Sequence, residues 1–255
     1  MIDIHRHILP GFADGQTSMA ASVKIASQAA QQGITSIIAT PHHPVYTADE
    51  SNAIYDAVEE LNHRLADMQI PVVIQPGQGT RIHGDIVDDI NRGEIMAIGA
   101  AGVHIMLELP HDHVPDYTTN VLFDMQIAGY VPVLTQPERN DEIMSNPDKL
   151  YRMVKNGALV QIGAANLAGK GGGKVSKFVN RMIDANLAHF IATGRQPRAK
   201  NKLYFAEAYQ QLKKNHDSHT VRYFHENIEA MMNGYDIQAY PPERMTQKKF
   251  LFFKT

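Results

Sequence analysis

The 255-residue chain contains no cysteine and no tryptophan. Without a thiol it cannot form disulfides, zinc–thiolate sites or iron–sulfur clusters, and it cannot use a cysteine nucleophile. Its first residues, MIDIH, lack the basic start and apolar run of a signal peptide, and no stretch of about 18 apolar residues exists to span a bilayer. We therefore expect a cytoplasmic protein without a transmembrane segment.

An excess of charge of either sign is also missing. The formal net charge is −3, and basic residues form no block before the C-terminal end. This balance gives no electrostatic footprint for nucleic acid, so we expect no nucleic-acid partner. Hydrophobic residues make up 44% of the chain and charged residues 20%, as in a folded globular domain. The length suits one α/β barrel, and we predict a single domain over residues 1–240 followed by a basic and aromatic tail over residues 241–255.

Short apolar runs alternate with longer amphipathic stretches, the pattern of strand–helix units around a parallel sheet or barrel. The predicted strands cover residues 2–5, 36–40, 72–76, 103–109, 131–135, 159–162 and 189–193. The predicted helices cover residues 18–32, 49–68, 116–128, 147–156, 175–186, 203–213 and 220–232. Polar residues capable of chemistry follow the strands, where the functional sites of such folds lie.

The most informative motif is DIHRH at residues 3–7, where the first strand ends in His5 and His7. Side chains two apart on an extended strand share a face, so both imidazoles point to the same side. At the C-terminal mouth of a barrel, such a pair delivers two nitrogen ligands to one divalent ion. The alternative is a pair of solvated histidines, because an HxH motif is short.

Three further positions add to this signal. The sequence TPHH ends the second predicted strand with His42 and His43. Glu108 stands between two leucines at the end of the fourth strand, where either bridging metal ions or a buried ion pair would offset the burial of its charge. Asp14 lies in the loop GFADG and serves either as a ligand or as a turn-former.

With these motifs the sequence resembles the bacterial tyrosine-protein phosphatases of the polymerase and histidinol phosphatase (PHP) superfamily, which accompany capsule and exopolysaccharide operons. The likeness covers nearly the whole chain. Its motifs are MIDIHRHILP (1–10), GITSIIATPHH (33–43), PGQGTRI (76–82), HVP (113–115) and PERN (137–140), with LAG (167–169) and EN (226–227) in support. The resemblance implies a distorted TIM-like barrel of about seven strand–helix units, and metal-dependent hydrolysis of phosphotyrosine.

Similar proteins hold three metal ions through nine ligands, usually with manganese. Five of those positions keep a ligand residue here: His5, His7, Asp14, His42 and Glu108. Four do not: Gly79, Gln136, Gly194 and Gln196. The family sequences GQE, HPERN and DxH are replaced by GQG, QPERN and GRQ, and a neutral amide is a poor substitute for imidazole on a transition metal.

The resemblance assigns His5, His7 and Glu108 to one ion, which lacks its remaining ligand at Gly194. Two histidines and one carboxylate can still hold an ion with open positions. We therefore expect at most one weakly bound divalent ion, Mn²⁺ by resemblance. Arg195 adds positive charge beside the missing aspartate, and such a pocket could bind a phosphate without hydrolysing it.

Arg139 occupies the family position next to the active site and is the candidate catalytic residue, since a guanidinium binds phosphoryl oxygens bidentately. Its alternative role is an ion pair with Glu138 or Asp141. Five other histidines near strand ends are interpreted as structural or solvated side chains: His43, His83, His104, His111 and His113.

Two segments remain outside these motifs. The sequence GKGGGK at residues 169–174 lacks the GxxxxGK[ST] spacing of a phosphate loop, so it predicts a flexible surface loop. The tail carries Lys248, Lys249 and Lys254 around FLFF, a composition that fits a mobile arm, a packing segment or a membrane-touching segment.

Two functional hypotheses follow. The resemblance implies a manganese-dependent phosphatase that acts on a phosphotyrosine protein, a bacterial tyrosine kinase controlling capsule or exopolysaccharide synthesis, with activity weakened by the four missing ligands. The alternative is an inactive relative that binds phosphotyrosine or the kinase without hydrolysis. The four losses in an otherwise intact scaffold also fit an engineered variant of an active enzyme, and the sequence leaves a homo-oligomer open.

Overall fold

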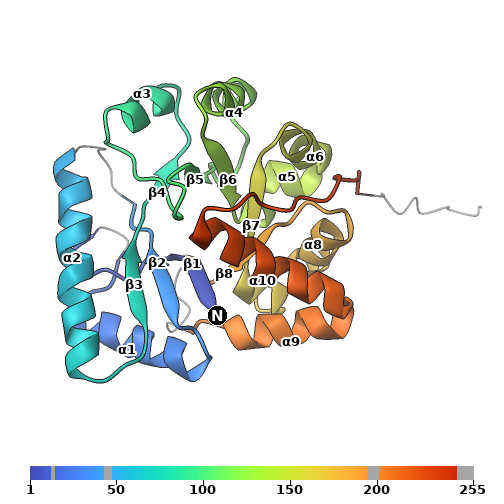
Figure 1. The fold of residues 1–255 in the computed structure, drawn as a ribbon. Coiled ribbons are helices and arrows are strands. Elements are labelled where there is room, and N and C mark those ends of the chain that lie inside the picture. Colours follow the sequence, from blue (N-terminus) through green and yellow to red (C-terminus); the bar gives the residue numbers. More distant parts are fainter. Residues whose placement is uncertain (13–14, 43–47, 195–201, 246–255) are drawn as a thin grey trace, which may run out of the picture.

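The computed structural model describes residues 1–12, 15–42, 48–194 and 202–245. Its strands are β1 (Ile2–Arg6), β2 (Ser36–Ala39), β3 (Val73–Pro76), β4 (Gly79–Arg81), β5 (His104–Glu108), β6 (Val131–Thr135), β7 (Leu159–Gly163) and β8 (Phe190–Ala192). Its helices are α1 (Met19–Gln31), α2 (Ala48–Asp67), α3 (Ile86–Asn91), α4 (Thr118–Ile127), α5 (Asp141–Ser145), α6 (Asp148–Lys155), α7 (Ala164–Leu167), α8 (Gly173–Asp184), α9 (Phe205–Asn215), α10 (Ser218–Asn233) and the 3₁₀ helix η1 (Pro137–Arg139). Helices surround the strands, so the chain is a single α/β domain (Figure 1).

The strands form two parallel sheets with the orders β1-β2-β3 and β4-β5-β6-β7-β8. The predicted seven-stranded barrel is therefore wrong in two respects, because the described residues contain eight strands and these strands do not close into one barrel. The unpredicted strand is β4, which is separated from β3 by only two residues. Between them the Gln78 side chain accepts a hydrogen bond from the Met96 N–H at 2.9 Å, which fixes the chain where it passes from one sheet to the other.

Side-chain and backbone contacts join β1 to β8 without a strand ladder. The Gly194 N–H donates to the His5 carbonyl at 2.8 Å. The Asp3 carboxylate, which is fully buried, accepts from the Thr193 N–H at 2.9 Å and from its hydroxyl at 2.5 Å. Burial raises the pKa of Asp3, while the Thr193 hydrogen bonds and the charge of buried Arg6 act in the opposite direction. These contacts hold the first strand beside the last.

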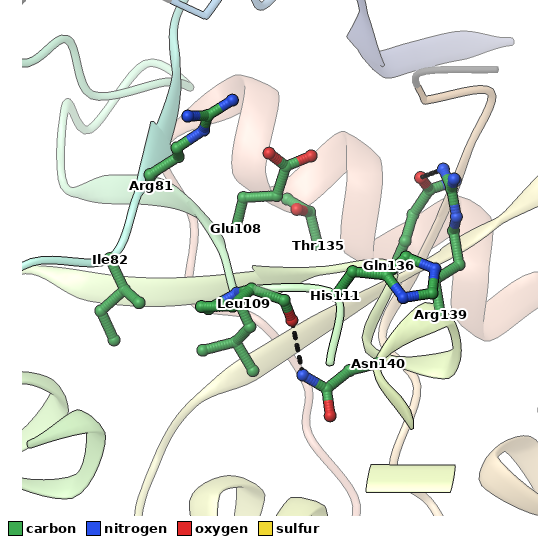
Figure 2. Close-up of a pocket in the computed structure, with 10 residues that line it drawn as sticks. Arg81, Ile82, Glu108, Leu109, His111, Thr135, Gln136, Arg139 and Asn140 are labelled. Atoms are coloured by element: carbon green, nitrogen blue, oxygen red, sulfur yellow. Dashed lines mark hydrogen bonds between the residues drawn. The ribbon is translucent and has the colours of Figure 1, made fainter. Parts of the chain in front are cut away.

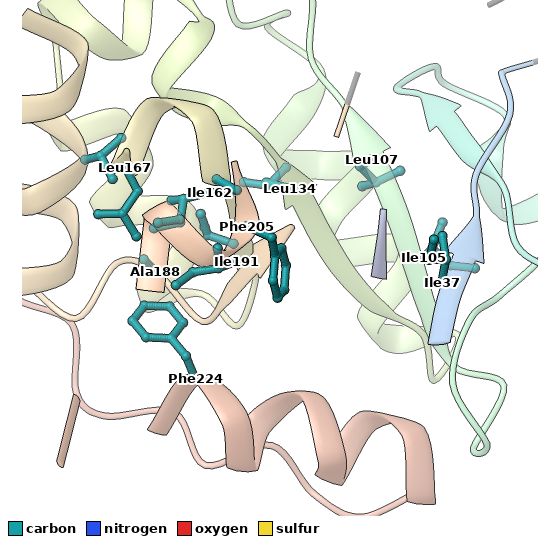
Figure 3. Close-up of a cluster of buried hydrophobic side chains, with 14 of the residues drawn as sticks. Ile37, Ile105, Leu107, Leu134, Ile162, Leu167, Ala188, Ile191, Phe205 and Phe224 are labelled. Atoms are coloured by element: carbon teal, nitrogen blue, oxygen red, sulfur yellow. The ribbon is translucent and has the colours of Figure 1, made fainter. Parts of the chain in front are cut away.

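Two apolar clusters pack the strands. The larger one lies between the sheets and the helices and includes Phe205 and Phe224, both fully buried (Figure 3). The smaller one contains Ile4 of β1, Val133 of β6 and Phe190 of β8. It draws side chains from both sheets, so apolar contacts on the inside hold the two sheets together.

All seven predicted helices are confirmed in substance, with ends shifted by a few residues. The sequence did not predict α3, α5, α7 or η1, which are too short to show a helical period. Within the described ranges, no helix combines the length and apolar composition that crossing a bilayer requires.

The described start of the predicted tail packs on the domain. The Glu243 N–H donates to the Ala185 carbonyl at 2.8 Å, and Met245 is buried. The lysines and phenylalanines of the tail lie beyond residue 245, outside the described residues.

Candidate functional site

His5 and His7 lie together at the carboxyl end of β1, as their spacing predicts. Their Nε2 atoms are 3.2 Å apart, and both side chains are buried. The pairing of β1 with β2 shifts register between Asp3 and Arg6, the stretch that contains His5. Such irregularities are common next to functional sites.

His42 and Glu108 form a second pair next to the first. His42 Nε2 lies 3.2 Å from Glu108 Oε2, and the ring centroids of His7 and His42 are 5.0 Å apart. His42 follows β2 and Glu108 ends β5, so the pair links the two sheets. Burial alone would raise the pKa of Glu108, but the hydrogen bond and charge of His42, with smaller effects of His5 and His7, lower it to about 2. Glu108 is therefore ionised at neutral pH, as a metal ligand has to be.

Gln161 on β7 orients His5. Its Oε1 lies 2.9 Å from His5 Nδ1, while its Nε2 donates to the Ile162 carbonyl at 2.7 Å. This arrangement places the proton of His5 on Nδ1 and leaves Nε2 as an acceptor that can bind a metal. Burial, followed by the neighbouring charge of His7, lowers the pKa of His5 to about 3, so the imidazole is neutral at physiological pH. We did not predict this role, although a glutamine inside an apolar strand is a signal that points to it.

The residues of both pairs suit a divalent ion. Two ligands about 2.1 Å from one ion lie roughly 3.0–3.4 Å apart, which matches the 3.2 Å separation within each pair. Among the described residues, however, no three histidine or acidic side chains form a group with the geometry of a metal site. The donors fit an ion with few protein ligands, and they do not form a complete centre for several ions.

Three of the four positions at which the family resemblance implies a missing ligand lie around these pairs. Gly79 begins β4, and a Cβ there would be 3.0 Å from His42 Nε2, so position 79 faces the site. The Gln136 amide lies between two glycines: a Cβ on Gly163 would be 2.5 Å from Gln136 Nε2, and a Cβ on Gly194 would be 2.6 Å from it. Gln136 therefore occupies the space into which a side chain at position 194 would project.

Arg139 lies on η1 and contacts Gln136, since its Nη1 donates to Gln136 Oε1 at 3.3 Å. Glu138 is one of the two partners, with Asp141, in the predicted alternative ion pair, and the charge of Arg139 is the smallest of several effects that lower the pKa of Glu138. That carboxylate is fully buried and accepts from the Gly163 N–H at 2.7 Å and from Asn166 Nδ2 at 2.8 Å. Burial raises the pKa of Glu138, and these hydrogen bonds partly oppose the rise.

Arg139 lines a cavity of about 560 Å³ at the carboxyl ends of β4, β5 and β6. Figure 2 shows Arg81, Glu108 and Thr135 on one side of this cavity and Gln136 with Arg139 on the other. The cavity thus has cationic side chains on two sides and the candidate ligand Glu108 at its wall, a combination suited to an anionic group held next to a metal ion.

Asn140, the last residue of the PERN motif, has a structural role. Its Oδ1 accepts from the Ile143 N–H at 2.8 Å and so caps α5. Its Nδ2 donates to the Pro110 carbonyl at 2.6 Å and to the His113 carbonyl at 2.7 Å. Asn140 therefore fixes the loop that carries His111 against the cavity.

The remaining predicted residues fall into two groups. Asp14, His43, Arg195 and Gln196 lie outside the described residues. Of the other histidines, His83 pairs with Asp89 at 2.7 Å, His113 contacts Asp112 at 2.8 Å, and His104 is buried. His111 lines the cavity, so it lies closer to the candidate site than we expected.

Comparisons with known proteins agree with this geometry. The chain is 38% identical to the tyrosine-protein phosphatase YwqE of Bacillus subtilis over 255 residues, covering 99% of this chain and all of that protein. It is 34% identical to the putative tyrosine-protein phosphatase CapC of Staphylococcus aureus over 194 residues, covering 76% of each protein. Both relatives are aligned over most of their length, so the likeness concerns the whole fold.

A solved structure gives the same result. It belongs to work on YwqE from Bacillus subtilis and CpsB from Streptococcus pneumoniae, described as metal-dependent tyrosine phosphatases. It superposes on this chain with a TM-score of 0.91 at 38% identity, covering 97% of this chain and all of the other. The model of the CpsB/CapC family of capsular polysaccharide synthesis matches residues 1–233. The chain therefore belongs to the CpsB/CapC family.

Proposed function

We propose that this protein is a divalent-metal-dependent phosphatase of phosphotyrosine proteins whose turnover is weak compared with that of an enzyme holding a full set of ligands. Its relatives are tyrosine-protein phosphatases, and one is described as metal-dependent. The observation that carries the proposal is the placement of the His5–His7 and His42–Glu108 pairs beside the cavity that Arg81 and Arg139 line. The proposed substrate is a bacterial tyrosine kinase that controls capsule or exopolysaccharide synthesis, and the proposed ion is Mn²⁺.

The side chains of the cavity have separate tasks in this proposal. Arg139 and Arg81 bind the phosphoryl oxygens from two sides, which orients the phosphorus toward Glu108. His5 with His7, or His42 with Glu108, would hold the ion. When bound, a divalent ion lowers the pKa of water and offsets the charge that develops on the phosphoryl oxygens. Each effect stabilises the transition state by several kcal/mol.

A second candidate function is phosphotyrosine binding without hydrolysis, and one observation favours it. The Gln136 amide fills the space beside Gly163 and Gly194, and its oxygen accepts a hydrogen bond from Arg139. This side of the site therefore packs a neutral amide and two glycines next to an arginine, with the buried Glu138 carboxyl bonded to the Gly163 N–H. Such an arrangement can bind phosphate through the guanidinium while it contributes no charged ligand to an ion.

Two measurements distinguish the two candidate functions: the metal content of the protein, and its hydrolysis of a phosphotyrosine peptide with added Mn²⁺. We expect one or fewer ions per chain and slow turnover, which falls to background in His7→Ala and Glu108→Ala. His63→Ala is the matched control, because His63 is an exposed histidine on α2 and should leave turnover unchanged. Turnover that survives both site variants would exclude the phosphatase proposal. Peptide binding without any turnover would establish the second candidate.

A further inference from the structure

A second groove adjoins the candidate phosphotyrosine cavity. Its volume is about 660 Å³, and it shares His111, Gln136 and Arg139 with that cavity. The two spaces therefore meet at Arg139. Because a peptide continues on both sides of its phosphotyrosine, a groove that begins at the phosphate-binding arginine is placed to receive the neighbouring residues.

The outer wall of this groove is basic. It includes Lys170 and Lys174 from the glycine-rich segment GKGGGK and from the start of α8. Within the described residues no ion pair joins either lysine to a carboxylate, and Lys170 Nζ lies 5.5 Å above the ring of Tyr204. Asp141 is the exposed acidic residue of the lining, and it lies 3.8 Å from His111.

The glycine-rich segment is held against the groove by a close contact. A Cβ on Gly171 would be 2.3 Å from Asn166 Oδ1, so only glycine fits this approach. Asn166 Nδ2 in turn donates to Glu138 Oε1 at 2.8 Å, which connects the segment to the residue before Arg139. The segment is exposed at the surface, as its composition predicts, and this contact places it along the groove.

The groove also holds a buried polar atom that the described protein leaves without a hydrogen bond. Glu138 lines the groove and is fully buried, and its Oε2 has no partner within the described residues while its Oε1 has two. A buried carboxyl oxygen without a protein partner is uncommon in folded proteins and is a place where an ordered water binds. The wall of the groove at Glu138 is therefore polar.

From these observations we infer that the groove is a substrate subsite, in which Lys170 and Lys174 bind an acidic residue that neighbours the phosphotyrosine. The inference rests on the proposed phosphotyrosine site and adds a preference among its substrates. Exposed lysines contribute modest, salt-dependent attraction, so the preference should be a few-fold and should shrink as salt rises.

The test is fluorescence anisotropy with three labelled peptides. The first carries phosphotyrosine flanked by aspartates, the second carries asparagine in place of each aspartate, and the third has the aspartates with unphosphorylated tyrosine. The wild-type chain should bind the first peptide about fivefold more tightly than the second, and the third only weakly. Lys170→Gln combined with Lys174→Gln should remove the difference in affinity between the first two peptides.

Lys177→Gln is the matched control, because Lys177 is exposed on α8 and does not line the groove. It should bind all three peptides like the wild-type chain. Equal binding of the first two peptides by the wild-type chain overturns the subsite and leaves the phosphotyrosine site standing. If neither phosphopeptide binds, the proposed function itself fails, and the subsite fails with it.

Discussion

The two sides of the candidate site are built differently. On one side, His5, His7 and Glu108 present ligand atoms, and Gln161 holds His5 in the tautomer that a metal requires. On the other side, the Gln136 amide fills the space between two glycines and bonds to Arg139. One side thus presents an ionised carboxylate and basic nitrogens as ligands, while the other presents a closely packed neutral amide and an arginine.

This difference indicates that the residues at positions 136 and 194 depend on each other. A side chain at position 194 would meet Gln136, so the glycine there leaves the amide its space. A larger residue at position 194 therefore disturbs packing unless position 136 changes with it.

The largest effect is expected from a variant that places metal-ligand residues on both sides of the site. A variant with Gly79→Glu, Gln136→His, Gly194→Asp and Gln196→His supplies the ligand types that the family resemblance implies. We expect its Mn²⁺-dependent hydrolysis of a phosphotyrosine peptide to exceed that of the wild-type chain roughly 100-fold or more, since metal-site contributions amount to several kcal/mol. Steady-state kinetics with and without Mn²⁺ measure this gain.

The control for this variant has similar side-chain volumes without new charged or imidazole ligands: Gly79→Gln, Gln136→Asn and Gly194→Asn. Its turnover should stay at the wild-type level. A comparable gain in the control would mean that packing, and not ligand chemistry, limits the wild-type chain.

His189 is a buried histidine that lies away from the site, and it provides a contrast with the site histidines. His189 precedes β8, is fully buried, and accepts a hydrogen bond from the Val160 N–H through Nδ1 at 3.0 Å. Burial lowers its pKa to about 4, against about 6.5 in an unfolded chain. The unfolded state thus binds the proton more readily, so stability is complete above pH 6.5 and is lost as the pH falls toward 4.

His189→Asn keeps an acceptor but removes the titration. The stability difference between wild type and variant, measured by urea unfolding across this pH range, should change by about 2 kcal/mol between pH 7 and pH 5. His5 titrates in both proteins and cancels in the difference. A pH-independent difference would show that His189 does not take up a proton on unfolding in this range.

The smallest expected effect is the coupling between positions 194 and 136. Gly194→Ala places a Cβ 2.6 Å from Gln136 Nε2 at a backbone φ of +62°, so it should destabilise the wild-type chain by about 2 kcal/mol. In the Gln136→Ala background the steric part disappears, which predicts a coupling of about 1 kcal/mol in a double-mutant cycle.

Gly102→Ala is the matched control for this cycle, since Gly102 has a φ of +63° and nothing lies within 4 Å of its Cβ position. Gly102→Ala should lower the free energy of unfolding by about 1 kcal/mol in both backgrounds, because it introduces backbone strain alone. Equal costs for Gly194→Ala with and without Gln136 would mean that the two positions are independent.

The sequence predicted the long elements of the fold and missed the short ones. Helices such as α1 and α10 show a clear apolar period and caps, so their positions could be read directly. In contrast, β4 has three residues, and two residues separate it from β3. Such a segment is too short to show any hydrophobic period. The division into two sheets depends on this strand, which is why a single barrel was predicted.

The site was predicted in part for a similar reason. The spacing of His5 and His7 is local and defines a shared face, and the structure brings them together with His42 and Glu108. The placement of Gln136 could not be predicted, because it has a left-handed backbone with a φ of 46° directly before a proline, where extended conformations prevail. Its contact with Gly194 joins segments that only the folded chain brings together.

The contact between Asp3 and Thr193 bears on the order in which the protein assembles during synthesis. These residues are 190 positions apart, and the Asp3 carboxylate finds its hydrogen-bond donors only at the end of the last strand. Loops of that length close late, because their entropy has to be offset by contacts formed earlier. Strand β1 is synthesised before β8, yet it reaches its final position only after Thr193, about three-quarters of the way along the 255 residues, has been made.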